Sequence, residues 1–333
     1  MQKNRRSLPL EIVFSIAVLV LGVSGFMTRG QATESKLDQG SKLLREHRMA
    51  EAKVIFEDYI TEKPSPQRLY DVAKAYEKVS EWGQATQYHQ QVLKQRPKSA
   101  QAWTELALAH YENKKTDDAI DALRSALSFS GKNGRSYIVL ANIYEKLGNR
   151  YEARIIYGDM LKKKIEPAFA SSRLCHLFAI ESYFDEALKH CRQAVDRDPK
   201  DMNSLVTYGQ VLVDKGEKSK GLFELARAAA RFKNEAMPFR VRGMIYLEDG
   251  NFALARKDLG TAVGLDPLDS ESAVNLGHAF FEAGLYDQAL IAYTEAARLD
   301  KRYTIELSKR SRMLSIKKET TAFEKYKERL SQL

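Results

Sequence analysis

Apolar residues recur three and four positions apart along most of this chain, in blocks separated by short polar or glycine turns. One block carries Tyr137 and Tyr144, and the block that follows Gly148 carries Ala153 and Met160. Each block has the period of an amphipathic α-helix with one apolar face. A short turn between two such blocks makes them antiparallel neighbours. The pattern therefore predicts helical hairpins.

Two sets of small residues show that the hairpin repeats. The first set is Gly40, Ala73, Ala107, Ala141, Cys175, Gly209, Gly243 and Gly277, and the second is Ala52, Ala85, Ala119, Ala153, Ala187, Gly221, Ala255 and Ala289. Within each set the spacing is 33 residues once and 34 residues thereafter. Such a period is typical of stacked hairpins that bury their apolar faces against their neighbours. Small residues allow the paired helices to approach closely.

Other residue types keep the same register when Ala100 is counted as position 1 of a unit. Proline occupies position 32 as Pro64, Pro97, Pro199 and Pro267, and aromatic residues occupy position 11 as Tyr76, Tyr144, Phe178, Tyr246 and Phe280. A proline at position 32 ends the second helix and turns the chain toward the next unit. We expect the aromatic residues to fill the hairpin interior.

This register resembles the tetratricopeptide repeat family, whose pattern of Trp, Leu, Gly, Tyr, Ala, Phe, Ala and Pro it follows unit by unit. The resemblance covers residues 33–303 as eight units: 33–65, 66–99, 100–133, 134–167, 168–201, 202–235, 236–269 and 270–303. It implies an all-α, right-handed α-solenoid. Residues 304–333 continue the helical pattern with basic residues on the inner face, which predicts a capping helix pair. Gly221 in place of alanine predicts a softer sixth hairpin.

The N-terminus predicts a membrane anchor or a signal peptide. Residues 1–7 are basic, and residues 8–28 form a hydrophobic segment long enough for one helix across a bilayer. The basic residues favour a cytoplasmic N-terminus, with the repeats on the other side of the membrane. Signal peptidase cleavage near Phe26 or Thr33 is the alternative, and it would release a soluble protein.

The net charge of +9 belongs to the two ends of the chain. Residues 1–30 contribute +3 and residues 301–333 contribute +6, so the array between them is neutral. This balance argues against a nucleic-acid groove along the repeats. Cys175 and Cys191 lie on the two helices of one hairpin, where either buried thiols or a single disulfide would fit.

Candidate chemistry is sparse. Cys175, His176, His190 and Cys191 resemble a metal set only in sequence, because the register directs His176 away from the two cysteines. His176 and His278 share position 9 but lie three units apart. No nucleophile recurs with a base, and no phosphate-binding loop is complete. We therefore expect no enzyme, metal, cofactor or small-molecule substrate.

The family resemblance implies a concave groove lined by positions 2, 5, 9 and 12 of the first helices, where protein partners dock. The later units supply a mainly apolar lining, namely Phe169, His176, Val206, Gln210, Val213, Met237, Arg240, Met244, Leu247, Val274, His278 and Phe281. Burial of part of this lining between neighbouring units is the alternative. A second candidate surface, for an acidic partner or anionic lipid, is Lys309, Arg310, Arg312, Lys317 and Lys318, with a solvated cap as its alternative.

These observations predict a non-catalytic, membrane-anchored scaffold that assembles or stabilises an envelope complex. Its partner would be a peptide or helical segment of a protein, and its array would lie outside the cytoplasm, in the periplasm of a bacterium. An exported soluble chaperone or adaptor and an accessory subunit of an envelope enzyme complex are the alternatives.

Overall fold

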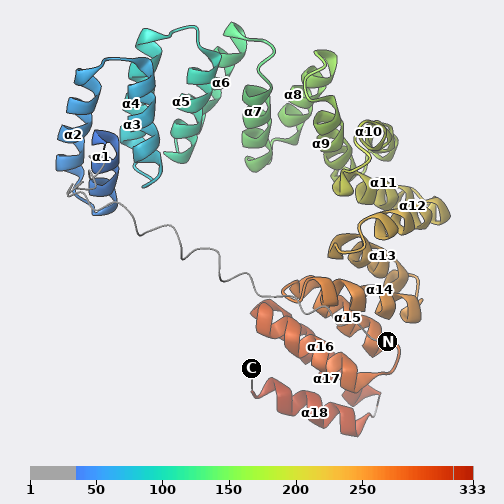
Figure 1. The fold of residues 1–333 in the computed structure, drawn as a ribbon. Helices are drawn as coiled ribbons and strands as arrows, with labels where there is room; N and C mark the ends of the chain where they lie inside the picture. Colours follow the sequence, from blue (N-terminus) through green and yellow to red (C-terminus); the bar gives the residue numbers. More distant parts are fainter. Residues whose placement is uncertain (1–34, 318, 333) are drawn as a thin grey trace, which may run out of the picture. The chain divides into compact units, whose positions relative to one another are not determined.

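Eighteen α-helices and one short 3-10 helix build the chain in a computed structural model that describes residues 35–317 and 319–332 (Figure 1). No β-strand occurs in these ranges, and the predicted all-α fold is confirmed. The predicted basic segment 1–7 and hydrophobic helix 8–28 lie outside the described residues and stay predictions. Among the helices that are described, none is long and apolar enough to cross a bilayer.

Contacts divide the chain into two units, residues 1–88 and 89–333, with the boundary inside α4. The helices of the first unit are α1 (Lys36–Arg45), α2 (Met49–Glu62), α3 (Pro66–Glu77) and the first half of α4 (Trp82–Gln95). After the second half of α4, the second unit contains α5 (Ala100–Glu112), α6 (Thr116–Phe129), α7 (Gly134–Lys146), α8 (Arg150–Lys162), α9 (Pro167–Ile180), α10 (Phe184–Arg197), α11 (Met202–Asp214), α12 (Lys218–Arg231), α13 (Ala236–Glu248), α14 (Phe252–Leu265), α15 (Ser270–Glu282), α16 (Tyr286–Leu299), η1 (Lys301–Tyr303), α17 (Thr304–Ile316) and α18 (Thr320–Leu330).

Each of the eight repeat hairpins from α1 to α16 turns through one residue in the left-handed region. These residues are His47, Ser80, Lys114, Gly148, Ser182, Gly216, Gly250 and Gly284. A positive φ at the end of a helix directs the chain back along it, and glycine adopts this conformation without a steric cost. The four other residues, His47 among them, adopt it although a side chain makes it less favourable.

A small residue on the first helix faces a large one sixteen positions later on the second. A Cβ built at Gly40 would lie 2.3 Å from the Phe56 ring, and one at Gly277 would lie 2.7 Å from the Tyr293 ring. The same arrangement joins Gly209 with Leu225 and Gly243 with Leu259. The first set of small residues is therefore small chiefly because a large side chain of the partner helix packs over it.

Gly221 corrects one prediction from the sequence. A Cβ at this position would lie 2.5 Å from the carbonyl oxygen of Gly209 and 2.9 Å from the amide nitrogen of Val213. Both atoms are backbone atoms of α11 and cannot swing away as a flexible side chain would. Gly221 is thus required by close helix packing, and it does not mark a soft hairpin.

We expect Gly221→Ala to destabilise the protein by about 1–3 kcal/mol, because overpacking outweighs the gain in helix propensity. The matched control is Gly158→Ala, since no atom lies within 4 Å of the new Cβ in α8. The control should raise stability by up to about 1 kcal/mol. Urea unfolding followed by circular dichroism compares the two, and equal stabilisation by both would contradict the close approach.

Helices α17 and α18 cover the last hairpin. Leu307 and Leu314 of α17 are fully buried, and so is Tyr326 of α18. The Tyr326 hydroxyl donates a hydrogen bond of 3.1 Å to the backbone oxygen of Tyr286. The rest of α18 is mostly exposed and polar, as a terminal helix requires for solubility.

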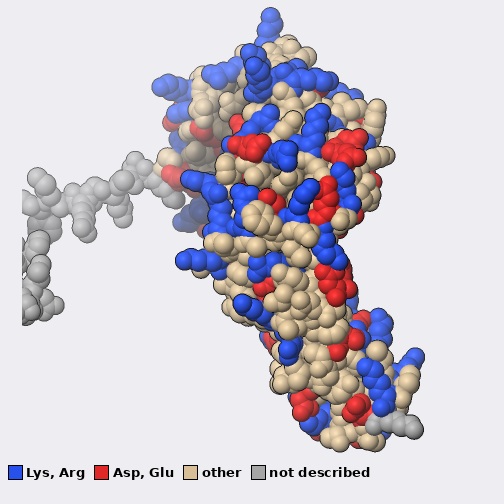
Figure 2. Space-filling view, turned by 90° about the vertical axis from the view of Figure 1, so that its right-hand side faces the viewer, with Lys and Arg blue, Asp and Glu red and all other residues tan. Residues whose placement is uncertain are grey.

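Charged side chains of both signs are intermixed over the face of the molecule shown in Figure 2. Lys and Arg do not gather there into one continuous field. This distribution agrees with the neutral charge balance of residues 31–300. A large single-sign field, as on many nucleic-acid-binding surfaces, is not present on that face.

Candidate partner-binding groove

The first helices of successive hairpins contact one another in the second unit. Helix α9 contacts α11, α11 contacts α13, and α13 contacts α15. Residues one helical turn apart on these helices face the same side. The side chains at positions 2, 5 and 9 can therefore form one continuous surface.

One cavity of about 520 Å³ lies on this surface, and we call it the α9–α13 pocket. It is lined by Glu166, Ala168, Phe169, Ser172, Arg173, His176, Asp198, Asp201, Asn203, Thr207 and Met237. The structure thus brings together three residues predicted for the groove, namely Phe169, His176 and Met237. Partial burial, and then the nearby Arg173 charge, lower the pKa of His176, so its ring is neutral at neutral pH.

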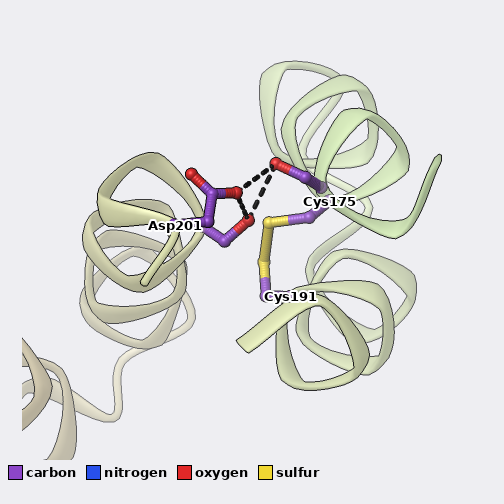
Figure 3. The surroundings of a disulfide bond; sticks show 5 residues. Cys175, Cys191 and Asp201 are labelled. Carbon is purple, nitrogen blue, oxygen red and sulfur yellow. Dashed lines mark hydrogen bonds between the residues drawn. A yellow bond between two sulfur atoms is a disulfide. The ribbon is translucent and has the colours of Figure 1, made fainter. Parts of the chain in front are cut away.

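A polar cluster forms one wall of the α9–α13 pocket. Asp201 caps α11 by accepting a hydrogen bond from the backbone N–H of Asn203 at 3.1 Å. The Ser172 hydroxyl of α9 donates to the Asp201 carboxylate at 2.8 Å, and Ser204 donates to Ser172 at 2.8 Å. Figure 3 shows Asp201 with these hydrogen bonds beside the helix that carries Cys175. The cluster joins two hairpins and fixes the polar groups of the pocket.

Arg173 is held in place by a neighbouring hairpin. Its guanidinium contacts the Glu145 carboxylate of α7, with Nε at 3.2 Å, and the buried Tyr157 hydroxyl donates to the same carboxylate at 2.7 Å. Burial opposes the charge of Arg173, but the hydrogen bond to Glu145 raises its pKa overall. Burial, and then Glu145, raise the pKa of Tyr157. Arg173 therefore lines the pocket with a side chain that is held by Glu145 and whose charge is compensated.

Arg173 also lines a second cavity of about 300 Å³, the α5–α9 pocket. Its lining residues are Leu108, Tyr111, Glu112, Val139, Asn142, Ile143, Glu145, Lys146 and Arg173. The two pockets share Arg173, so the surface suited to a partner extends into hairpins that the sequence did not favour.

The other predicted groove residues differ in exposure. Gln210 is exposed, and Val213, Arg240, Met244, Leu247 and His278 are half-buried. Val206, Val274 and Phe281 are 1%, 4% and 1% exposed. These three were wrongly assigned to an accessible lining, because adjacent helices pack over them. The alternative expectation, that part of this lining is buried between neighbouring units, therefore applies to these three positions.

Two of the half-buried residues already have partners within the chain. Arg240 contacts Glu271 at 2.6 Å and Asp269 at 3.4 Å. His278 lies 3.4 Å from the Glu306 carboxylate and packs against the Tyr293 ring. Burial, then Arg310, lower the pKa of His278, while Glu306 opposes them. Both side chains tie neighbouring hairpins together.

The basic residues of the C-terminal candidate surface do not act as one set. Lys309 lies 2.7 Å from Glu306, and Arg310 lies 3.0 Å from Glu282 and 4.9 Å from the Phe281 ring centroid. Lys317 also lies above that ring. Arg312 is exposed, whereas Lys318 lies outside the described residues. With its side chain only 16% exposed, Arg310 is a packing residue, which corrects its assignment as a free contact.

Cys175 and Cys191 form a disulfide between α9 and α10, one of the two alternatives that the sequence left open (Figure 3). Their Cα atoms are 4.7 Å apart, and their separation of 16 residues matches the pairing of small and large residues in the other hairpins. The disulfide thus takes the place of that contact. No group of three metal-ligating side chains occurs in residues 35–317 and 319–332.

We expect reduction of this disulfide to lower the free energy of unfolding by about 3 kcal/mol, the value for a closed loop of about 15 residues. Urea unfolding with and without dithiothreitol measures the difference. The control is the double variant Cys175→Ala with Cys191→Leu, which restores a small and large pair and should not respond to dithiothreitol. An unchanged wild-type midpoint would show that the bond does not stabilise the hairpin.

Several lining residues were missed in the sequence. They are Asp201, Ser172, Arg173 and Glu145, none of which was a candidate site residue in the sequence. One signal was available, because Phe169, Arg173 and His176 follow helical spacing on α9. The contact of Arg173 with Glu145 joins different hairpins, and no local pattern indicates it.

Comparison with known proteins identifies the repeats. A tetratricopeptide repeat family model matches residues 70–136 and 240–303, and a second one matches residues 134–159. The human protein named Tetratricopeptide repeat protein 6 is 24% identical over 197 residues, which is 58% of this chain and 38% of that protein. Anaphase-promoting complex subunit cut9 of Schizosaccharomyces pombe is 26% identical over 142 residues, 43% of this chain and 20% of that protein. This chain therefore spans less than two fifths of either relative.

A solved structure shares the fold. The crystal structure of the APC/C hetero-tetramer Cut9-Hcn1 matches 80% of this chain and 53% of its own chain, with a TM-score of 0.52 at 13% identity. At this identity the likeness concerns the fold alone, which is a stack of helical hairpins.

Proposed function

We propose that this chain, whose repeats match tetratricopeptide repeat models over residues 70–159 and 240–303, is a non-catalytic scaffold that binds a segment of a protein partner along α9, α11 and α13. The observation that carries this proposal is the α9–α13 pocket, where Phe169, His176 and Met237 converge. The related subunit cut9 belongs to the anaphase-promoting complex, and its solved structure is a complex with Hcn1. A protein partner for a chain of this fold is supported by that relative.

The lining of the α9–α13 pocket suits an extended or helical segment that carries one apolar side chain. Phe169 and Met237 offer apolar and adaptable contacts. Ser172, Asn203 and Thr207 offer hydrogen-bonding groups to the backbone of the segment. The Arg173 charge is compensated by Glu145, so the acidic groups of the pocket favour a segment that donates hydrogen bonds.

The scaffold is membrane-anchored in this proposal, with residues 8–28 as the anchor and the repeats outside the cytoplasm, where they support an envelope complex. Two observations support this: the hydrophobic sequence of that segment, and the Cys175–Cys191 disulfide, since disulfides persist in oxidising compartments. Sequencing the N-terminus of the mature protein tests the anchor. A start near Phe26 or Thr33 would instead support the exported soluble chaperone or adaptor.

Filling the pocket should weaken partner binding. We expect His176→Arg combined with Asn203→Arg to weaken capture of the partner by about tenfold or more, because the two long side chains occupy the cavity. The partner is first identified by crosslinking to the full chain and is then tested as a purified protein. The control, Glu186→Arg with Ser219→Arg, places two arginines at exposed positions of α10 and α12. Equal affinity of both variants would refute the groove.

A further inference from the structure

A separate cavity of about 540 Å³ lies between the second half of α4 and helices α5 and α6, and we call it the α4–α6 pocket. Helix α5 contributes Trp103, Leu106 and His110 to it, which are positions 4, 7 and 11 of their unit. The groove residues occupy positions 2, 5, 9 and 12. The pocket is therefore on a different side of its first helix from the partner-binding groove.

The cavity coincides with a departure from the repeat. Five other hairpins carry Tyr or Phe at position 11, whereas this one carries His110. In the next hairpin the Tyr144 hydroxyl reaches Arg124, with 3.2 Å between the oxygen and a guanidinium nitrogen. A histidine side chain is shorter than a tyrosine side chain, so His110 does not fill this space.

His110 is buried at the base of the pocket and is only 8% exposed. Its Nδ1 atom is inaccessible to solvent and has no hydrogen-bond partner within the described part of the chain. The nearest carboxylate oxygen, Oδ2 of Asp118, is 3.7 Å away, beyond hydrogen-bond distance. A buried polar atom without a partner is costly, so packing alone does not explain a histidine at this position.

The protonation state of the His110 ring determines which kind of ligand suits the pocket. Burial lowers the pKa of His110, with Lys115 acting in the same direction and Asp118 against it. The imidazole is therefore uncharged at neutral pH. A cationic ligand therefore meets no charge repulsion from this ring and can donate to the adjacent Asp118 carboxylate.

The remaining walls favour a cation with a flat or apolar stem. The Trp103 indole is fixed because its N–H donates to the Pro97 backbone oxygen at 2.8 Å. Leu93, Leu106 and Ala122 provide apolar surface. Such a surface beside an indole ring is the setting in which arginine side chains stack.

Charge at the rim agrees with a cationic ligand. In residues 35–317 and 319–332, Asp118 forms no ion pair with a lysine or arginine, and Asp121 has only an exposed pair with Arg124 at 3.4 Å. Lys94 also lines the pocket, but the two carboxylates outnumber it. No three of these side chains form a metal-binding group.

From this geometry we propose that the α4–α6 pocket binds an arginine side chain of a protein partner, with its guanidinium donating to Asp118 and stacking on Trp103, in the space that His110 leaves open. This gives the array a second recognition site, independent of the groove along α9, α11 and α13. A partner segment with an arginine then contacts the α4–α6 pocket whether or not another segment occupies the groove.

Tryptophan fluorescence of the full chain tests this site. Trp82 is replaced by phenylalanine so that Trp103, the second of the two tryptophans, is the only one that reports. The probe is the blocked tripeptide Gly-Arg-Gly, and the control probe carries citrulline, which has the same shape without the charge. We expect saturable quenching by the arginine peptide and a dissociation constant about tenfold higher for citrulline, the cost of one charged hydrogen bond.

Two variants locate the binding. Asp118→Asn removes the charge, and His110→Tyr fills the cavity as in the other hairpins, so both should weaken the arginine peptide by about tenfold. The control is Glu186→Gln. Glu186 occupies the position of Asp118 two hairpins later, and its replacement should leave the affinity for the arginine peptide unchanged. Circular dichroism confirms folding, and His110→Tyr keeps the test valid if Asp118→Asn unfolds. Equal binding of the citrulline peptide or of Gly-Glu-Gly, or unchanged affinity in His110→Tyr, would overturn the proposal.

Discussion

Replacing Arg242 by methionine should lower the free energy of unfolding by about 3–5 kcal/mol, because Asp258 would remain buried without its cation. Arg242 Nε and a terminal guanidinium nitrogen lie 2.5 and 2.8 Å from the two Asp258 oxygens. The two side chains are 17% and 5% exposed. The pair joins α13 to α14, so its loss destabilises the seventh hairpin. Urea unfolding followed by circular dichroism measures the loss.

The exposed pair of Arg298 with Glu295 is the matched control. It has the same two-point geometry, at 2.9 and 2.5 Å, but its side chains are 63% and 41% exposed. Arg298→Met should therefore cost less than about 1 kcal/mol. Adding Asp258→Leu to Arg242→Met should recover most of the lost stability. A loss below 1 kcal/mol for Arg242→Met would mean that the pair is solvated.

Phe281→Ala should also cost about 3–5 kcal/mol, the usual value for removal of a fully buried aromatic side chain. The Phe281 ring packs against Tyr286 at 5.2 Å and Tyr326 at 6.4 Å between ring centroids. Its removal leaves a cavity where the last hairpin meets the capping helices. Thermal and urea unfolding of the full chain measure the effect.

The comparison variant for Phe281 is Ile316→Ala, since Ile316 is 75% exposed. That change should alter stability by less than about 0.5 kcal/mol. If Phe281→Ala kept the wild-type stability and instead weakened partner binding, the residue would belong to the groove after all. The two outcomes distinguish a packing role of Phe281 from a role in partner binding, both of which the sequence pattern allows.

The hairpin register was predictable because it depends on local spacing. The positions of the small residues, the turn residues and the aromatic residues follow from a 34-residue period, and the helices pair as that period requires. Arg242 was a visible exception, as it stands at position 7, where Leu106 and Leu140 are apolar. Its partner Asp258 lies sixteen positions later, at the distance that joins the two helices of every hairpin.

The accessible lining of the groove was less predictable, because a register gives the direction of a side chain but not the distance to the next hairpin. Val206 and Val274 occupy groove positions of the register and are nevertheless covered. The Ser172–Asp201–Ser204 cluster and the Arg173–Glu145 contact depend on the packing between hairpins. For the same reason, the choice between free thiols and a disulfide required the distance between α9 and α10.

The functional consequence is a more polar groove than the sequence predicts. Apolar lining is concentrated at Phe169 and Met237, while fixed hydrogen-bonding groups surround them. A partner is then selected by donors placed around one apolar side chain, and less by a broad hydrophobic contact.

Site-specific photocrosslinking tests the central claim, that this array binds a protein partner along α9, α11 and α13. Benzoylphenylalanine is placed in the full chain at His176 or Asn203, which line the α9–α13 pocket, and at the exposed second-helix positions Phe223 or Ile291. We predict that one and the same partner is crosslinked from His176 and Asn203 and from neither second-helix position. Crosslinks to a specific partner only from Phe223 or Ile291 would contradict the account.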